Sequence, residues 1–100
     1  MAGMSCGARS FGAASLIVAM PTALPPYMQG RVRELVGVHV PEGQRHQGLA
    51  SELLTRTMRE AKRKATVLML TVDDDALEAF YARFGFQAIQ RTPKILMVYP

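Results

Sequence analysis

The sequence contains a single cysteine, Cys6, and no Cys/His cluster at metal-ligand spacing. One thiol cannot form an internal disulfide, so the composition indicates a reducing compartment, and we expect a cytoplasmic protein without a structural metal ion. No apolar run reaches the about 20 residues that a membrane helix requires. The sequence also lacks internal repeats and low-complexity tracts.

Dense positive charge is missing as well. Twelve Lys and Arg against eight Asp and Glu give a net charge of +4, but the basic residues are spread along the chain. The densest run is Arg59, Lys62, Arg63 and Lys64, which falls in the last turns of a predicted helix, where cations complement the helix dipole. No strand interleaves aromatic and basic residues, so we expect no binding to nucleic acid. The mild positive excess favours an anionic ligand.

The composition that remains is that of one globular domain. The 100 residues are 49% hydrophobic and 20% charged, enough for one core without covalent crosslinks. Residues 1–10, rich in Gly, Ala and Ser, predict a loose start. Arg9 followed by the apolar residues 11–20 loosely resembles an export signal. Gly12 and Ser15 interrupt that run and its cleavage pattern is poor, so we favour a buried strand at residues 16–20.

Apolar spacing predicts the remaining elements. Residues 31–40 indicate a strand whose imperfect alternation fits burial on both faces or a bulge. Residues 49–65 have helical spacing, and residues 67–72 form a nearly continuous apolar run. Strand, helix and strand in this order indicate a parallel unit with a right-handed crossover. Asp75 and Glu78 resemble a capping box for a helix over residues 76–84, with Gly85 just after its end. Residues 86–89 and 95–99 predict two strands joined by a turn.

The junction between the 31–40 strand and the next helix is a candidate phosphate site. Free backbone N–H groups and the positive dipole end at a helix start attract phosphate oxygens. Gly48 lets the backbone approach a ligand, and Arg45 adds a positive charge. The spacing is neither that of a P-loop nor that of a dinucleotide-binding GxGxxG motif. Taken alone, a glycine near a helix start is a weak signal, because most such glycines only relieve steric strain.

Two sequence blocks together resemble the GNAT superfamily of N-acyltransferases. The family signature is Arg or Gln, two residues, Gly, one residue, then Gly or Ala, and residues 45–50 match it position by position. Residues 38–41 and 51–54, on either side, are also similar to the family. The second block, residues 77–86, carries Tyr81 and the pair Gly85-Phe86. The resemblance covers about residues 31–100, which we expect to be the acyl-CoA-binding core of a single domain.

The resemblance implies an α/β fold of the α+β kind, with a mixed, mainly antiparallel sheet, a central parallel βαβ unit and splayed strands. It implies acetyl-CoA as co-substrate. Backbone groups at the end of the 36–40 strand would pair with the pantetheine arm, and the amides of residues 45–50 would hold the pyrophosphate. The implied cofactor-binding residues are Val38, His39, Val40, Arg45, His46, Gln47, Gly48, Leu49, Ala50, Ser51 and Asp74.

The resemblance also implies two catalytic residues. Tyr81 would protonate the leaving CoA thiolate, since a phenol with a pKa near 10 suits a thiolate of pKa about 8.5; the alternative is a tyrosine packed on the sheet with its hydroxyl in water. Glu34 would deprotonate the amine, as a glutamate does in part of the family; the alternative is a solvated edge glutamate. In a regular strand the His39 side chain points away from Glu34, so we expect it to be structural unless a bulge redirects it.

Three features depart from the family pattern. Gln44 replaces a usual aromatic or apolar residue, and Asp74, which would repel phosphate, replaces a frequent asparagine. Residues 1–30 show no resemblance, whereas family members carry two helices and more strands there, and those helices line the acceptor pocket. We therefore expect the acceptor half to be reduced or absent.

The sequence thus predicts an N-acetyltransferase that moves an acetyl group from acetyl-CoA to a primary amine by direct attack. The alternative is an acyl-CoA-binding module without catalysis, because the acceptor side is short. We expect a homodimer, in which a second subunit completes the pocket or covers an exposed sheet edge. The sequence does not identify the amine, which belongs either to a small molecule or to a protein.

Overall fold

The computed structural model describes residues 3–22, 24–41, 43 and 48–99. The elements, in order along the chain, are β1 (Gly7–Phe11), β2 (Ala14–Ala19), α1 (Pro26–Gln29), β3 (Val32–His39), α2 (Leu49–Arg63), β4 (Val67–Val72), α3 (Asp75–Ala82), β5 (Gln87–Gln90) and β6 (Ile95–Tyr99). The six strands form one sheet in the order β1-β2-β3-β4-β6-β5. The pair β3–β4 is parallel and the other pairs are antiparallel. The predicted mixed sheet with a parallel βαβ unit is confirmed.

The N-terminal segment contradicts the loose start that its composition predicted. β1 pairs with β2 from Gly7↔Val18 to Phe11↔Ala14, and the Met4 side chain is completely buried. A short strand of mostly small residues has no marked hydrophobic periodicity. The sequence of this segment therefore gave no sign of the strand, and a loose segment was predicted. The neighbouring apolar run does form the predicted strand, as β2.

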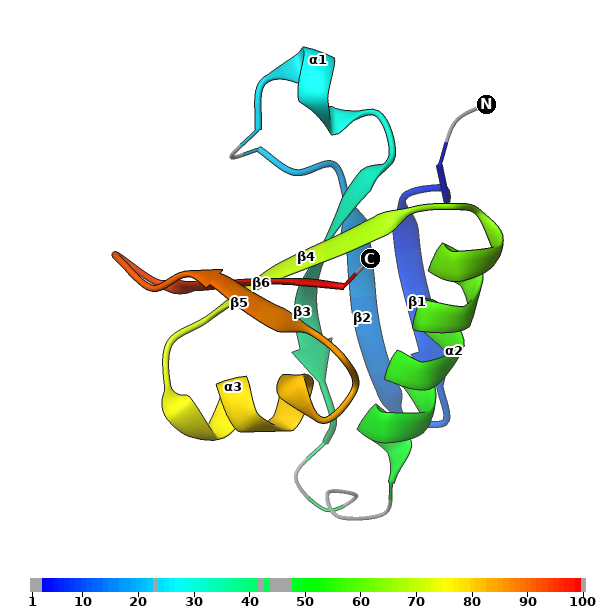
Figure 1. Ribbon diagram of the computed structural model, residues 1–100. Helices are drawn as coiled ribbons and strands as arrows, with labels where there is room; N and C mark the ends of the chain where they lie inside the picture. The colour runs from blue at the N-terminus through cyan, green and yellow to red at the C-terminus, as the bar shows by residue number, and fades with distance from the viewer. Residues whose placement is uncertain (1–2, 23, 42, 44–47, 100) are drawn as a thin grey trace.

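Helix α2 packs along one face of the sheet, beside β1 and β2 (Figure 1). Its buried side chains meet alternate residues of the strands, since successive side chains of a strand lie on opposite faces. We call this the α2 face. Its core residues are Leu16, Val18, Leu35, Leu53, Leu54, Met58, Ala61, Leu68, Leu70, Val72 and Met97. The intervening residues of β2 and β3, among them Ile17, Ala19 and Glu34, lie on the opposite side, which we call the second face.

Helix α3 begins at a different cap from the one predicted. Asp74 is the N-cap, and its carboxylate accepts a 2.8 Å hydrogen bond from the backbone N–H of Leu77. The predicted capping box of Asp75 and Glu78 is therefore wrong, and Glu78 instead pairs with Arg91 at 2.8 Å. The predicted role of Gly85 is confirmed: it has φ 100°, and its N–H donates to the carbonyl of Ala82.

The two parallel strands separate after a short common stretch. β3 and β4 pair from Val32↔Val67 to Glu34↔Met69, and residues 35–39 of β3 and 70–72 of β4 lie beyond that pairing. Figure 1 shows the two strands at a wide angle, with α3 near their diverging ends. The splayed strands expected from the family resemblance are therefore present.

A β-bulge at Gly37 changes which side chains of β3 share a face. Ile17 pairs with Val36, and Ser15 pairs with His39. Between these two pairs β2 advances by two residues, whereas β3 advances by three. The extra residue is accommodated at Gly37, whose φ of 62° is costly for other residues. Residues paired across antiparallel strands point to the same face, so His39 lies on the second face with Glu34. The expectation for a regular strand is thus wrong here, and the bulge redirects His39.

Candidate active site

A cavity of about 900 Å³ opens where β3 and β4 diverge. It lies at the carboxyl ends of two parallel strands, beside the first turn of α2 and one side of α3, and its size is typical of ligand sites. The lining residues are Glu34, Leu35, Val36, Gly37, Val38, His39, Val40, Gly48, Leu49, Ala50, Ser51, Leu70, Thr71, Val72, Leu77, Phe80, Tyr81 and Arg83.

Most of the predicted site residues that the structure describes meet at this cavity. They are Glu34, Val38, His39, Val40, Gly48, Leu49, Ala50, Ser51 and Tyr81. The predicted phosphate ligands Arg45, His46 and Gln47 lie outside the described residues, as does Gln44. Asp74 does not appear in the cavity lining, and its carboxylate caps α3.

The first turn of α2 forms the positive end of the cavity. Gly48 is the N-cap, and its carbonyl accepts the hydrogen bond from Glu52 that closes the first turn. The N–H groups of residues 49–51 therefore have no partner within the helix and lie at the positive end of its dipole. Gly48 has φ 75°, and a Cβ there would meet nothing within 4 Å. Within the described protein, the left-handed backbone rather than crowding accounts for this glycine.

Tyr81 contributes a buried phenol to the cavity wall. Its side chain is 7% exposed, and its ring makes edge contacts with Phe80 and Phe86, at centroid distances of 5.1 and 5.7 Å. Its hydroxyl makes no hydrogen bond to another described residue. Burial raises the pKa of Tyr81, because a phenolate would lose its hydration. At neutral pH this group is therefore a proton donor.

Glu34 supplies a carboxylate at the far end of the same cavity. It is half-buried in β3, between Ala19 of β2 and Met69 of β4. Its side chain has no hydrogen bond or ion pair to another described residue. About 15 Å of strand separates it from His39, next to the start of α2. The cavity therefore offers positive polarity at one end and a negative charge at the other.

The sequence analysis missed several lining residues. They are Leu70, Thr71 and Val72 at the end of β4, and Leu77, Phe80 and Arg83 on the side of α3. The guanidinium of Arg83 lies 5.5 Å from the centroid of the Phe80 ring. Helical spacing gives a signal that would have found the second group, because Phe80 and Tyr81 follow Leu77 by three and four residues and so lie on the same side of the helix as Leu77.

A family model connects this geometry to known proteins. The model of the Acetyltransferase (GNAT) family matches residues 7–86. The chain belongs to the GNAT acetyltransferase family. Transfer of an acetyl group from acetyl-CoA to an amine is the general chemistry of this family. The match begins at β1, whereas the sequence resemblance began at residue 31, so the strands of the N-terminal part belong to the family domain.

Solved GNAT structures have the same fold. The ribosomal-protein-S18-alanine N-acetyltransferase from Escherichia coli superposes with a TM-score of 0.69 at 24% identity, over 88% of this chain and 61% of that one. An acyl-CoA N-acyltransferase from Pseudomonas aeruginosa gives 0.66 at 27% identity, over 88% and 60%. A GNAT family acetyltransferase from Elizabethkingia anophelis, solved with acetyl-CoA bound, gives 0.67 at 16% identity, over 86% and 67%. This chain thus spans about three fifths of the first two.

A search of curated protein sequences gave no match. In the part of the chain that the structure describes, no helix is both long and apolar enough to cross a membrane. Within the same residues, no group of three or more His, Cys, Asp or Glu side chains is placed to hold a metal ion.

Proposed function

We propose that this GNAT protein is an N-acetyltransferase that transfers the acetyl group of acetyl-CoA to a primary amine by direct attack. One observation carries the proposal: a single cavity joins the start of α2, a buried neutral phenol and a carboxylate that has no partner among the described residues. These are the three groups that the reaction needs, namely a phosphate site, an acid for the thiolate and a base for the amine.

Acetyl-CoA would lie along the diverging strands. Its pyrophosphate would bind the amides of residues 48–51 together with the loop residues 45–47, and its pantetheine arm would pair with the backbone of residues 38–40. The thioester would then lie in the gap between β3 and β4, between Tyr81 and Glu34. Holding amine and thioester in this arrangement supplies much of the rate, since correct positioning is worth about 7–11 kcal/mol in favourable cases.

The chemistry follows from the two side chains. Glu34 accepts a proton from the bound ammonium, directly or through water, and the free amine attacks the thioester carbonyl. The C–N bond forms and the C–S bond breaks, while Tyr81 gives its proton to the leaving thiolate. The nitrogen loses its second proton to solvent, Glu34 releases the first one to solvent, and solvent returns a proton to Tyr81. No covalent enzyme intermediate is needed.

Tyr81→Phe tests the acid role. We expect kcat to fall by about 10²–10⁴-fold, the usual range for loss of a general acid, while acetyl-CoA still raises the melting temperature. Tyr27→Phe is the matched control, because Tyr27 is 86% exposed and does not line the cavity. The measurement is release of free CoA thiol with a panel of amines. Normal turnover by Tyr81→Phe would refute the assignment of Tyr81.

The alternative is an acyl-CoA-binding module without catalysis. The groups that would bind the cofactor, namely the free amides at the start of α2 and the largely apolar cavity wall, do not depend on an acceptor site and would serve binding alone. A thermal shift with acetyl-CoA beside free CoA, followed by the amine panel, separates the two functions. Stabilisation without turnover of any amine favours the module, and absence of stabilisation counts against both.

We further propose that the protein is cytoplasmic and a homodimer whose second subunit completes the acceptor side or covers a sheet edge. β1 and β5 are the two edge strands of the described sheet, and unpaired edges favour association. Light scattering at working concentration tests the dimer, and a monomer mass would overturn it.

A further inference from the structure

Glu34 lies in apolar surroundings on the second face of the sheet. Its cross-strand neighbours are Ala19 and Met69. Along β3, its neighbours on the same face are Val32 and Val36, since side chains alternate there. The immediate neighbours of this carboxylate on the sheet are thus aliphatic, and the polar lining residue Thr71 lies farther along β4, two residues after Met69 on the same face.

This apolar surface continues outward from the cavity. Ile17 pairs with Val36, which lines the cavity. A Cβ on Gly37, another lining residue, would lie 4.0 Å from Cδ1 of Ile17. The Ile17 side chain is 48% exposed, so it offers free apolar surface at the rim of the cavity, next to Glu34.

Glu34 is the only carboxylate among the described residues that line the cavity. Other described acids are engaged elsewhere: Glu52 pairs with Arg56, Glu60 with Arg9, Glu78 with Arg91 and Asp73 with Lys94, and Asp74 caps α3. A ligand with one ammonium group is therefore matched in charge at Glu34. A second ammonium on the same ligand would lie against aliphatic side chains, where an unpaired charge is costly.

The backbone of this surface has little to offer a peptide. β2 is hydrogen-bonded to β1 on one side and β3 on the other, and β3 is paired on both sides at Glu34. Among the described residues, no strand edge is therefore free at Glu34 itself for the main chain of a peptide, and the unpaired edge of β3 beyond it would be taken by the pantetheine arm. Recognition on this side therefore falls to side chains, that is, to one charge and one apolar patch.

On the basis of the proposed acetyltransferase function, we infer that the acceptor is a small monoamine whose ammonium group is joined to an apolar chain or ring. The ammonium binds the Glu34 carboxylate, and the apolar part packs on Ile17, Ala19 and Val36. Polyamines carry additional charges that have no partner on this surface, and hydroxylated amines lack the apolar part that would pack there.

The test compares hexylamine and phenethylamine with ethanolamine and spermidine as acceptors, with acetyl-CoA saturating and release of CoA thiol as the readout. For the wild-type protein, we expect kcat/KM for the two apolar amines to exceed that for ethanolamine by about tenfold or more, because each buried methylene favours binding several-fold. Equal or faster turnover of ethanolamine, of spermidine or of a short peptide with an apolar first residue would overturn the inference.

Ile17→Ser and Ile89→Ser form a matched pair of variants. Both remove an exposed isoleucine, but Ile89 is 61% exposed on β5 and does not line the cavity. We expect Ile17→Ser to lower kcat/KM for hexylamine about tenfold and to leave ethanolamine unchanged, while Ile89→Ser changes neither. Equal effects of the two variants would contradict the inference.

The outcomes separate this inference from the proposed function. Stabilisation by acetyl-CoA with no turnover of any amine overturns the enzyme, and the inference with it. Turnover with a preference for ethanolamine or spermidine leaves the enzyme standing and overturns only the apolar monoamine. Because the wild-type comparison needs no variant, a poorly folding Ile17→Ser would not prevent a decision.

Discussion

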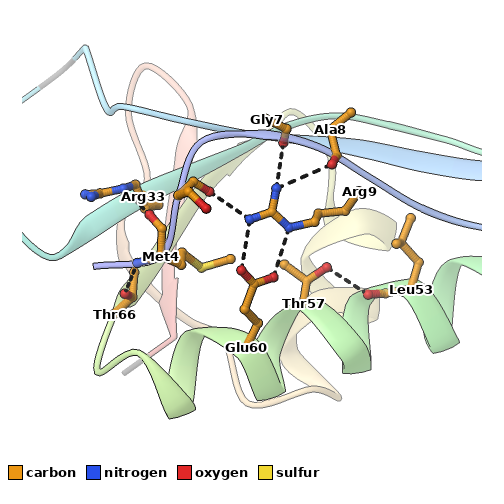
Figure 2. Close-up of polar contacts among 10 residues, drawn as sticks. Met4, Gly7, Ala8, Arg9, Arg33, Leu53, Thr57, Glu60 and Thr66 are labelled. Atoms are coloured by element: carbon orange, nitrogen blue, oxygen red, sulfur yellow. Dashed lines mark hydrogen bonds and ion pairs between the residues drawn. The ribbon is translucent and has the colours of Figure 1, made fainter. Parts of the chain in front are cut away.

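The ion pair between Arg9 and Glu60 joins β1 to α2 and allows a quantitative test of the fold. Figure 2 shows the guanidinium between the Glu60 carboxylate and the backbone of the N-terminal segment. Nε donates to Oε1 at 2.9 Å and Nη2 to Oε2 at 3.0 Å. The remaining N–H groups donate to the carbonyls of Ser5, Gly7 and Ala8. The two side chains are only 21% and 22% exposed.

Glu60→Gln removes the charge and one of the two hydrogen bonds while keeping the shape. Charge-assisted bonds contribute about 1.5–3 kcal/mol, and partial exposure together with the three carbonyls left to Arg9 argues for the lower end. A loss of about 1.5 kcal/mol corresponds to a fall in melting temperature of roughly 6–12 °C for a 100-residue domain. The control is Glu52→Gln. Its i,i+4 pair with Arg56 is exposed, so we expect a loss of at most about 0.5 kcal/mol, or roughly 2–4 °C.

The same pair predicts a dependence on pH. The hydrogen bonds from Arg9 lower the pKa of Glu60 in the folded protein. As the pH falls, the unfolded chain therefore binds this proton first, and the stabilisation is lost below the ordinary carboxyl pKa of about 4.3. Melting curves by circular dichroism at pH 7 and pH 3 should show a gap between wild type and Glu60→Gln that is narrower at the lower pH. A gap at pH 7 equal to that of Glu52→Gln, or a gap as wide at pH 3 as at pH 7, would refute the reasoning.

Three further predictions concern the site. Burial raises the pKa of Tyr81, so the activity assigned to its protonated form should decline only above the ordinary phenol pKa of about 10. In Tyr81→Phe, the pH–rate profile should no longer show this decline at high pH. Gly48→Ala should lower the melting temperature by roughly 4–8 °C, because its φ of 75° costs another residue about 1 kcal/mol, and should weaken the shift given by acetyl-CoA; unchanged values in both would contradict the site at α2. Asp74→Ala should cost about 1 kcal/mol as the loss of a helix cap, whereas Asp75→Ala should leave the melting temperature nearly unchanged; the reverse order would contradict the cap.

The elements with strong apolar periodicity were predictable from the sequence. β4 occupies residues 67–72 as expected, and α2 begins at the predicted Gly48 junction. In both elements, the apolar pattern that predicts the element lies wholly within its own residues. β1 was missed because its stability comes from distant partners. Arg9 and Glu60 are 51 residues apart, and Met4 donates its backbone N–H to Thr66, 62 residues away. The hydrophobic pattern of a short segment carries no information on partners so far away in the sequence.

The place of the candidate site was predictable, since Gly48, Tyr81 and Glu34, which the family resemblance pointed to, all line the cavity. The orientation of β3 was not, because alternation along a strand holds only if no residue is inserted. The consequence of the insertion is visible only in the structure. Leu35 and Val40 both pack against the core, although they are five positions apart, and an odd interval places two residues of a regular strand on opposite faces.

The insertion at Gly37 has a consequence for the assignment of the base. It brings His39 to the same face as Glu34, and imidazole is a common catalytic base. About 15 Å of strand still lies between the two residues. His39 is the last residue of β3, on the side of the connection to α2, whose amides would bind the phosphates of the cofactor, whereas Glu34 lies beyond the gap in which the thioester would sit. An amine that approaches from the second face would therefore meet Glu34, and for this reason we propose the carboxylate and not the imidazole as the base.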